Sequence, residues 1–345
     1  MDLQDRISAF VSLGNHILGA QTNKIANDFW QTISQAHFIN PWFTQDFCKQ
    51  AMKSIAKNWL NRSNLDAWIS KYPPSQLKHD KPKTIAVIMA GNVPFVGFHD
   101  MLCVLITGNK FLGKISSKDG GLMQALIDML YSIEPRFTSY ISIADGKLTD
   151  FDAVIATGSD NSARYFEYYF GKYPNIIRKN RHSVAILTGY ETEEELLKLT
   201  DDIFSYFGLG CRSVSKLLVP MNYNFEPLFE KMEKYKEFAN HNKYANNYQY
   251  YRAIFLMNQI YHLDNGFALL KPDESLGSPV GVVYYQHYAS ISDAVDYVNN
   301  NSNHLQCVVT RISGIANVVN FGESQSPLVS DYADGIDTMD FLFNI

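Results

Sequence analysis

The strongest constraint on the fold is a rhythm that begins at residue 84, where short apolar runs alternate with longer segments of helical periodicity. TIAVIMAG (84–91) is a β-branched run ending in glycine and predicts a buried strand. GLMQALIDML (121–130) repeats its apolar residues every three or four positions and predicts a helix. Strands connected through helices pair in parallel, because each connection must cross over the sheet. We therefore expect an α/β chain with parallel sheets.

The rhythm runs through two cycles. The predicted strands are 84–91, 109–116, 140–144, 152–157 and 182–187, then 213–220, 279–285 and 304–311. The predicted helices between them are 98–107, 121–130, 162–170, 191–207, 226–239, 244–262 and about 291–299. A chain of 345 residues with two such cycles is expected to form two domains.

A helical segment precedes the first cycle. Residues 1–75 read as helical, with Thr44, Asn61 and Asn64 as candidate helix ends. The run KYPPSQLKHDKPK (71–83) holds three prolines and four lysines and is the best linker candidate. The expected division is therefore 1–83, 84–188 and 189–345.

Composition excludes several classes of protein. Hydrophobic residues make up 46% and charged residues 19%, as in folded proteins with large cores, and the net charge of -5 without a basic stripe gives no support for nucleic-acid binding. The longest apolar stretches, such as 101–108, are too short for a membrane anchor, and the first ten residues do not resemble a signal peptide. The four cysteines are scattered, so we expect reduced thiols, no metal site and a cytoplasmic location.

Cys211 differs from the other three cysteines. It lies in FGLGCRSVSK, where two glycines allow close approach of the backbone to a ligand and Arg212 would favour the thiolate. Cys48, Cys103 and Cys307 lie in apolar patterns typical of buried structural residues. Cys211 is therefore the candidate nucleophile.

Several polar residues follow or precede predicted strands, and ligands of open parallel sheets bind at the carboxyl ends of the strands. Each feature alone is non-specific, because Gly, Asn and Ser are ordinary turn residues and Glu is usually an exposed surface acid. The candidates are Asn92 in AGNVP, Lys114, Ser116 and Ser117 in GNKFLGKISS, Thr157, Gly158 and Ser159 before a helix, and Glu274 in ESLG.

The order of these motifs resembles the aldehyde dehydrogenase superfamily, and in particular its fatty-acyl-CoA reductase branch, the LuxC family. The resemblance covers about residues 84–311 and implies two Rossmann-like parallel-sheet domains, an NADP-binding domain (84–188) and a catalytic domain (189–345). It implies that Cys211 is the nucleophile and that Asn92 donates to the oxyanion. It also implies that the cofactor contacts Lys114, Ser116, Ser117, Thr157, Gly158, Ser159 and Glu274.

Departures from the superfamily pattern refine this expectation. Arg178 and Lys179 stand where hydrolytic members carry a general-base Glu, so an acyl-enzyme would persist for a reductant and not for water. His182 lies nearby and reads better as a structural residue than as an acid or base. Ser117 replaces an acid that would repel a 2′-phosphate, which favours NADPH. The segment that usually bridges subunits is shortened near 71–83, so a homo-oligomer is possible but not specified.

The expected activity is the reduction of a long-chain fatty acyl-CoA, or an acyl-carrier thioester, to an aldehyde. Two alternatives stay open. The chain could be an NAD-dependent aldehyde dehydrogenase, or a non-catalytic nucleotide- or CoA-binding module on a decayed enzyme scaffold.

Overall fold

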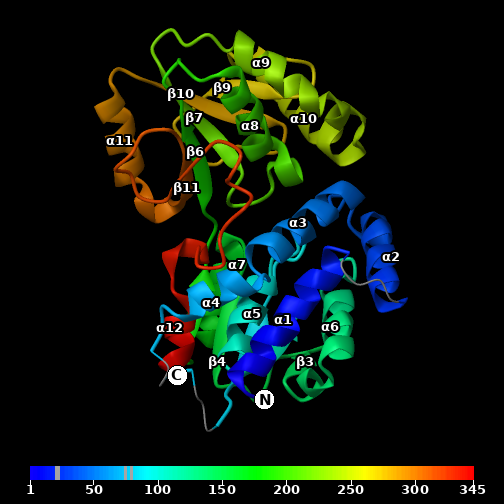
Figure 1. Cartoon of the computed structure of the whole chain (residues 1–345). Helices are drawn as coiled ribbons and strands as arrows, with labels where there is room; N and C mark the ends of the chain where they lie inside the picture. The colour runs from blue at the N-terminus through cyan, green and yellow to red at the C-terminus, as the bar shows by residue number, and fades with distance from the viewer. Residues whose placement is uncertain (20–23, 74–75, 78–80) are drawn as a thin grey trace. The chain divides into compact units, whose positions relative to one another are not determined.

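The computed structural model describes residues 1–19, 24–73, 76–77 and 81–345. It divides into two compact units, one formed by residues 1–180 with 326–345 and the other by residues 181–325 (Figure 1). The two units are described in turn.

Four helices open the first unit: α1 (Leu3–Ile17), α2 (Lys24–Ile39), α3 (Gln45–Asn58) and α4 (Arg62–Ile69). Two predicted helix ends are confirmed, because the side chains of Thr44 and Asn61 cap α3 and α4 by accepting from the Phe47 and Asn64 backbone N–H groups. Asn64 instead lies inside α4. The predicted linker 71–83 falls partly outside the described residues, at 74–75 and 78–80.

The first sheet has the strand order β3-β2-β1-β4-β5, and each neighbouring pair is parallel. Its strands are β1 (Thr84–Ile88), β2 (Lys110–Lys114), β3 (Ile141–Ile143), β4 (Ala153–Thr157) and β5 (Asn175–Arg178). Its connecting helices are α5 (Phe98–Ile106), α6 (Leu122–Ile133) and α7 (Asp160–Phe170). The strand order reverses at β1, so the turns after β1, β2 and β4 share one carboxyl edge around the switch point.

The second sheet has the order β12-β11-β6-β7-β10-β9-β8 and is parallel except for the β8–β9 pair. Its strands are β6 (His182–Ile186), β7 (Val214–Pro220), β8 (Leu263–Asp264), β9 (Leu269–Pro272), β10 (Val282–Tyr288), β11 (Leu305–Val309) and β12 (Val318–Val319). Its helices are α8 (Glu193–Phe204), α9 (Glu226–Met232), α10 (Asn242–Met257) and α11 (Ile291–Asn300). A helical N-terminal segment followed along the chain by two parallel sheets confirms the expected fold class.

Short 3-10 helices complete the two units. They span Pro135–Ser139, Ser205–Gly208, Glu233–Asn240, Ser302–His304 and Ala333–Gly335.

The division of the chain differs from the predicted boundary at 188/189. β6 pairs with β7 and β11, so the break falls after Asn180 and 182–187 belongs to the second unit. The last twenty residues, with α12 (Thr338–Phe343), belong to the first unit. They are held there by hydrogen bonds from Trp59 to the Pro327 carbonyl and from Arg178 to Thr338.

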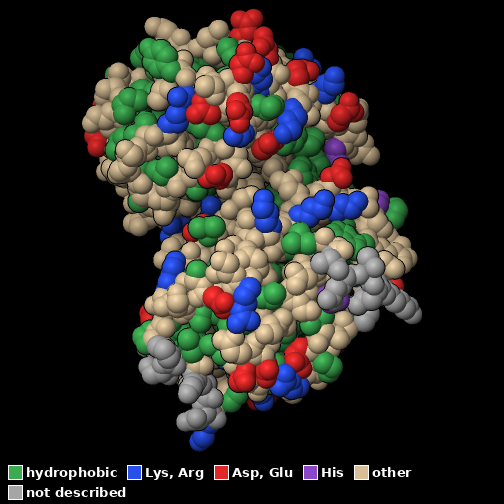
Figure 2. Space-filling view, in the orientation of Figure 1, with side chains coloured by type: hydrophobic (Ala, Val, Ile, Leu, Met, Phe, Trp, Pro, Cys, Tyr) green, Lys and Arg blue, Asp and Glu red, His purple; other side chains and the backbone are tan. Residues whose placement is uncertain are grey.

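The surface of each unit mixes charges of both signs on the face shown in Figure 2. Across the described part of the chain, the structure contains no helix with the length and apolar character that a membrane span requires.

Candidate active site

The turns after β1 and β2 pack directly against each other. A Cβ on Gly91 would lie 2.4 Å from the Ser116 hydroxyl, so this position requires glycine. The buried side chain of Asn40 donates to the carbonyl oxygens of Gly91 (3.3 Å) and Lys118 (3.0 Å) and so joins the two turns. Asn92 is exposed in the first turn.

Lys114, Ser116 and Ser117 follow or end β2. The Lys114 ammonium donates to the carbonyl oxygens of Ala144 and Asp145, beyond the end of β3. Ser116 accepts from the Lys118 backbone N–H, while the side chains of Ser117 and Lys118 are exposed. The exposed side chains at this strand end are therefore the Ser117 hydroxyl and the Lys118 ammonium, and neither is a carboxylate.

Thr157, Gly158 and Ser159 connect β4 to α7. Ser159 caps α7 by accepting from the Ser162 backbone N–H, and a Cβ on Gly158 would lie 2.8 Å from the Ser162 Cβ. The missing Cβ brings the backbone close to the helix start, where N–H groups and the helix dipole favour an anionic group. This arrangement fits the phosphates of a dinucleotide at the switch point of the sheet.

Arg178 does not offer a base or a surface cation. Its guanidinium is 4% exposed and forms a two-bond ion pair with Asp100, at 2.6 and 2.9 Å, besides its bond to Thr338. The neighbouring Lys179 is exposed and pairs with Glu167 at 2.9 Å. The two residues that replace the expected general base are therefore occupied in ion pairs.

The chain enters the Cys211 loop through an unusual backbone conformation. Tyr206 and Phe207 have φ values of 55° and 57°, and Gly208 follows at 73°. Only Gly adopts this left-handed region without strain, and each non-glycine residue there adds about 1–3 kcal/mol. Both aromatic side chains are buried, and this packing holds the strained turn just before the cysteine.

Cys211 is exposed, whereas Cys48, Cys103 and Cys307 are buried. Burial raises the pKa of Cys48 to about 12 and raises that of Cys103 well above the ordinary thiol value. Thiolate chemistry at neutral pH is therefore disfavoured at both. The Arg212 guanidinium donates to the Ser324 carbonyl oxygen.

A buried serine anchors the Cys211 loop to the sheet. The Ser183 hydroxyl donates to the Cys211 carbonyl oxygen (2.8 Å) and accepts from the Cys307 backbone N–H (3.2 Å). The strand register shifts at Ser183 on the β7 side and beside Cys307 on the β11 side. The hydroxyl thus supplies hydrogen bonds where the ladder is irregular, a feature common beside active sites.

Glu274 lies in the segment between β9 and β10, and its side chain is exposed. The Ser215 hydroxyl donates to the Leu276 carbonyl oxygen (2.8 Å) and to that of Ser183 (3.3 Å), and the His182 ring packs on Gly277. A Cβ on Gly277 would lie 2.1 Å from that ring, so the close approach of His182 requires glycine at this position. The Glu274 and Cys211 segments thus meet at the start of β6 and β7.

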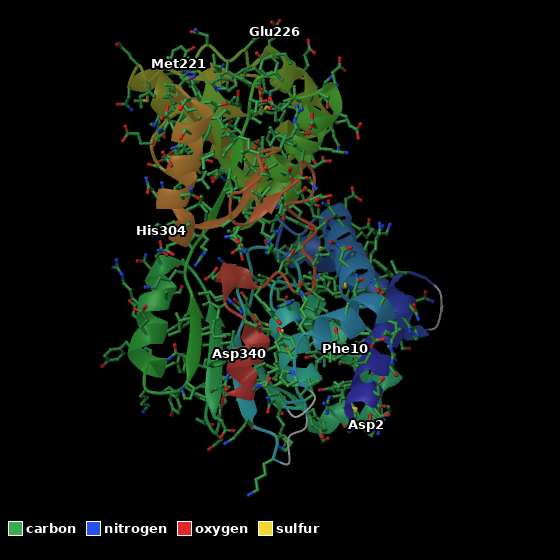
Figure 3. The ribbon with its side chains drawn as sticks, turned by 60° about the vertical axis from the view of Figure 1, so that its left-hand side comes forward. Asp2, Phe10, Met221, Glu226, His304 and Asp340 are labelled. Atoms are coloured by element: carbon green, nitrogen blue, oxygen red, sulfur yellow. The ribbon has the colours of Figure 1, made fainter. Side chains whose placement is uncertain are left out.

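A cavity in the second unit lies at the opposite edge of its sheet. His304, just before β11, marks the amino edge, and Met221 and Glu226 lie at the other end of the unit (Figure 3). A cavity of about 730 Å³ opens at that other end, lined by Met221, Tyr223, Phe225, Glu226, Tyr285 and His287 among others. Cys211 precedes β7, so this cavity does not belong to the cysteine site.

The candidate residues therefore form two groups. The first unit carries Asn92, Lys114, Ser116, Ser117, Thr157, Gly158 and Ser159 at one sheet edge, and the second unit contains Cys211 and Glu274. Sequence reasoning missed Asn40, Ser183 and Lys216. A lysine inside the apolar strand run SVSKLLVP was a signal for Lys216, whereas nothing in the sequence marks the other two.

The fold is shared with solved structures of other proteins. Aldehyde dehydrogenase 21 from Physcomitrella patens, solved with succinate, superposes with a TM-score of 0.69 at 12% identity, covering 100% of this chain and 84% of that one. The Pseudomonas syringae aldehyde dehydrogenase C mutant, solved with NAD+ and octanal, superposes with a TM-score of 0.61 at 10% identity, covering 90% and 72%. The chain therefore has the aldehyde dehydrogenase fold.

The family is narrower than the fold. The acyl-CoA reductase (LuxC) family model matches residues 34–318, and the chain belongs to this family. Long-chain acyl-protein thioester reductase 2 of Photobacterium leiognathi is 24% identical over 216 residues. That match covers 57% of this chain and 45% of the relative, so it spans less than half of the relative's length.

Proposed function

We propose that this chain reduces a long-chain fatty acyl thioester to the aldehyde, with NADPH as the reductant and an acyl group held on Cys211. The observation that carries the proposal is the exposed thiol of Cys211 in a strained, anchored loop of an acyl-CoA reductase family member. The Photobacterium relative is named a long-chain acyl-protein thioester reductase, which supports the substrate class.

In the proposed reaction the Cys211 thiolate attacks the acyl carbonyl carbon. The new carbon–sulfur bond forms as the bond to the CoA or carrier thiol breaks, and that thiolate leaves. A reduced nicotinamide nucleotide, when bound, would supply the hydride that brings the acyl carbon to the aldehyde level. The Cys211–carbon bond then breaks, the aldehyde leaves and the Cys211 thiolate is restored.

Asn92 is proposed to donate its amide N–H to the oxyanion. The support is the sequence resemblance together with its exposed place in the turn after β1. One such donor contributes about 2.7–4 kcal/mol of transition-state stabilisation. Phe95, in the same turn, has a φ of 58°, and such strained residues cluster at functional sites.

The proposed cofactor contacts are those that the sequence resemblance implies. The Thr157–Ser159 turn would face the pyrophosphate, and Glu274 would accept from the nicotinamide ribose. Ser117 favours NADPH, because no carboxylate there repels a 2′-phosphate and the exposed Lys118 is next to it. Lys114 would reach the adenosine ribose or its phosphate by exchanging its carbonyl partners for the nucleotide.

The occupied ion pairs of Arg178 and Lys179 favour reduction over hydrolysis. Activation of water needs an unprotonated base near the acyl carbon, and neither side chain can serve as one. The alternative of an NAD-dependent aldehyde dehydrogenase predicts carboxylate formation from an aldehyde and NAD+.

The proposal is tested by NADPH oxidation across acyl-CoA chain lengths, with acyl-carrier thioesters as a second arm. We expect oxidation coupled one to one with aldehyde, strongest for long chains and abolished in Cys211→Ser. Carboxylate formation from aldehydes, in place of thioester reduction, would support the dehydrogenase. Nucleotide binding without turnover would support a non-catalytic module.

A further inference from the structure

Lys216 is a fully buried lysine in the strand that follows the nucleophile. It is the third residue of β7, and its side chain is 0% exposed. Its ammonium donates three hydrogen bonds, to the Glu274 carbonyl oxygen (2.8 Å), the Gln286 side-chain oxygen (2.7 Å) and the Tyr297 hydroxyl (2.8 Å). An ammonium has three donors, so each one is satisfied.

These partners share an uncommon property, since none of them carries a charge. A buried lysine is usually paired with a carboxylate, because burial disfavours the charged form. Here burial lowers the pKa of Lys216 to about 8, while the nearby carboxylates of Asp273 and Glu274 act in the opposite direction. Such a lysine changes charge close to physiological pH.

The other elements packed around Lys216 bring few titratable groups. α11 contributes Tyr297, whose ring lies 4.7 Å from the ammonium and whose pKa is raised by burial, so its hydroxyl stays protonated. β10 contributes Gln286, and β6 places Val184 opposite Lys216. Asp273 is itself paired with Lys271.

Lys216 holds the Glu274 segment by its backbone and not by its carboxylate. The Glu274 carbonyl oxygen accepts from Lys216 and from the Tyr297 hydroxyl (3.2 Å). Two residues further on, Ser215 holds the Leu276 carbonyl oxygen. Adjacent residues of β7 thus fix the path of this segment while the Glu274 side chain stays exposed.

We propose that Lys216 is a positioning residue for cofactor binding, whose charged ammonium fixes the Glu274 backbone so that its carboxylate meets the ribose. This inference rests on the proposed function, because it assumes that Glu274 contacts the nucleotide. Above the pKa of Lys216 the neutral amine has only two donors. Nucleotide affinity is therefore expected to weaken on the alkaline side.

The test is a fluorescence titration that gives the Kd of NADPH for the full chain between pH 6.5 and 9.5. In the wild type, Kd should rise across roughly pH 8, as protons leave Lys216. Lys216→Met removes all three hydrogen bonds, and the loss of the one that holds the Glu274 carbonyl oxygen should raise Kd at pH 7 by about tenfold. The pH step should also disappear. Lys216→Arg, which stays protonated, should also lack the step and bind more tightly than Lys216→Met.

Tyr297→Phe is the milder variant, which keeps the ring and removes one partner of the ammonium; it should raise Kd less than Lys216→Met. Lys198→Met is the matched control, because Lys198 is half exposed on α8 and pairs with Glu194. Its Kd and pH profile should equal those of the wild type.

An unchanged Kd in Lys216→Met, or a pH step that persists in it, would overturn the inference. If Lys216→Met does not fold, a wild-type Kd that is constant from pH 7 to 9 overturns it equally. Acylation of Cys211 by acyl-CoA without nucleotide is the separating measurement. If the wild type is acylated normally and the NADPH Kd of Lys216→Met equals that of the wild type, this inference alone is rejected. If the wild type is not acylated or does not bind nucleotide, the proposed function is rejected and this inference with it.

Discussion

The hydroxyl of Ser183 donates a hydrogen bond of 2.8 Å to the carbonyl oxygen of Cys211. Ser183 is fully buried at the start of β6, so a residue inside the sheet holds the loop that carries the exposed Cys211 thiol. The backbone position of the proposed nucleophile therefore depends on a side chain of a neighbouring strand.

Ser183→Ala should slow acylation of Cys211 by about fivefold, equivalent to about 1 kcal/mol for one neutral hydrogen bond. The NADPH Kd should change little, in contrast to the effect expected of Lys216→Met. Stopped acylation reactions analysed by intact mass give the rate. Ser292→Ala, at an exposed serine of α11, is the control. A wild-type rate in Ser183→Ala would contradict the anchoring role.

Arg178→Met should destabilise the first unit by about 3–5 kcal/mol, because it leaves the buried Asp100 carboxylate without its partner. Chemical denaturation measures the loss. Arg62→Met, at an exposed pair with Asp66, should change stability by only about 0–1 kcal/mol. Similar losses of stability in both variants would show that the buried Asp100–Arg178 pair contributes no more than an exposed ion pair.

Asp119 should make stability depend on pH. Burial raises the pKa of Asp119 from the ordinary 3.8 to about 6, so the folded state binds a proton more tightly than the unfolded state. Its contribution is present below about pH 4 and lost as pH rises through 6, by at most about 3 kcal/mol. Asp119→Asn, measured by denaturation from pH 4 to 7, should flatten this slope.

The slope should not vanish in Asp119→Asn, because burial also raises the pKa of Asp202 to about 6. Asp128→Asn, at an exposed site on α6, is the control and should leave the wild-type slope. A slope that is equally steep in Asp119→Asn would argue against the raised pKa.

Limited labelling of the native protein with a maleimide should add one adduct, at Cys211. Burial protects the other three thiols, and the raised pKa values of Cys48 and Cys103 keep those two protonated. Peptide mapping locates the adduct, which should be absent in Cys211→Ser. A second adduct formed at the same rate would show that exposure does not single out Cys211.

The fold class followed from the sequence because apolar periodicity reports local structure directly. The apolar periodicity did not reveal which strands share a sheet. The run at 182–187 reads as a strand in either domain, and only its pairing with β7 and β11 places it in the second unit. The strands Asn175–Arg178 and Leu269–Pro272 were not predicted, because both are short and end in a cation or a proline.

The helix predicted over 191–207 ends at Phe204, where the chain turns through left-handed Tyr206 and Phe207. Propensity could not predict this turn, since both residues are disfavoured there and are held by packing. The anchoring bonds of Ser183, Ser215 and Lys216 were equally hidden, because their partners are mostly backbone carbonyls, which every residue carries. The positions of Lys114 and of the Thr157–Ser159 turn at carboxyl strand ends were predictable, because short apolar runs precede them. Cys211 precedes its strand, and its candidacy came from its glycine-rich surroundings and from the resemblance.

The most direct test of the central claim is the fate of one acyl group on the protein. The intact protein is incubated with a long-chain acyl-CoA without NADPH, and its mass is measured before and after NADPH is added. We predict a single acyl adduct on the peptide containing Cys211, absent in Cys211→Ser, which disappears with NADPH as one equivalent of aldehyde is released. An adduct of equal yield in Cys211→Ser, or aldehyde formed by that variant, would contradict the proposal.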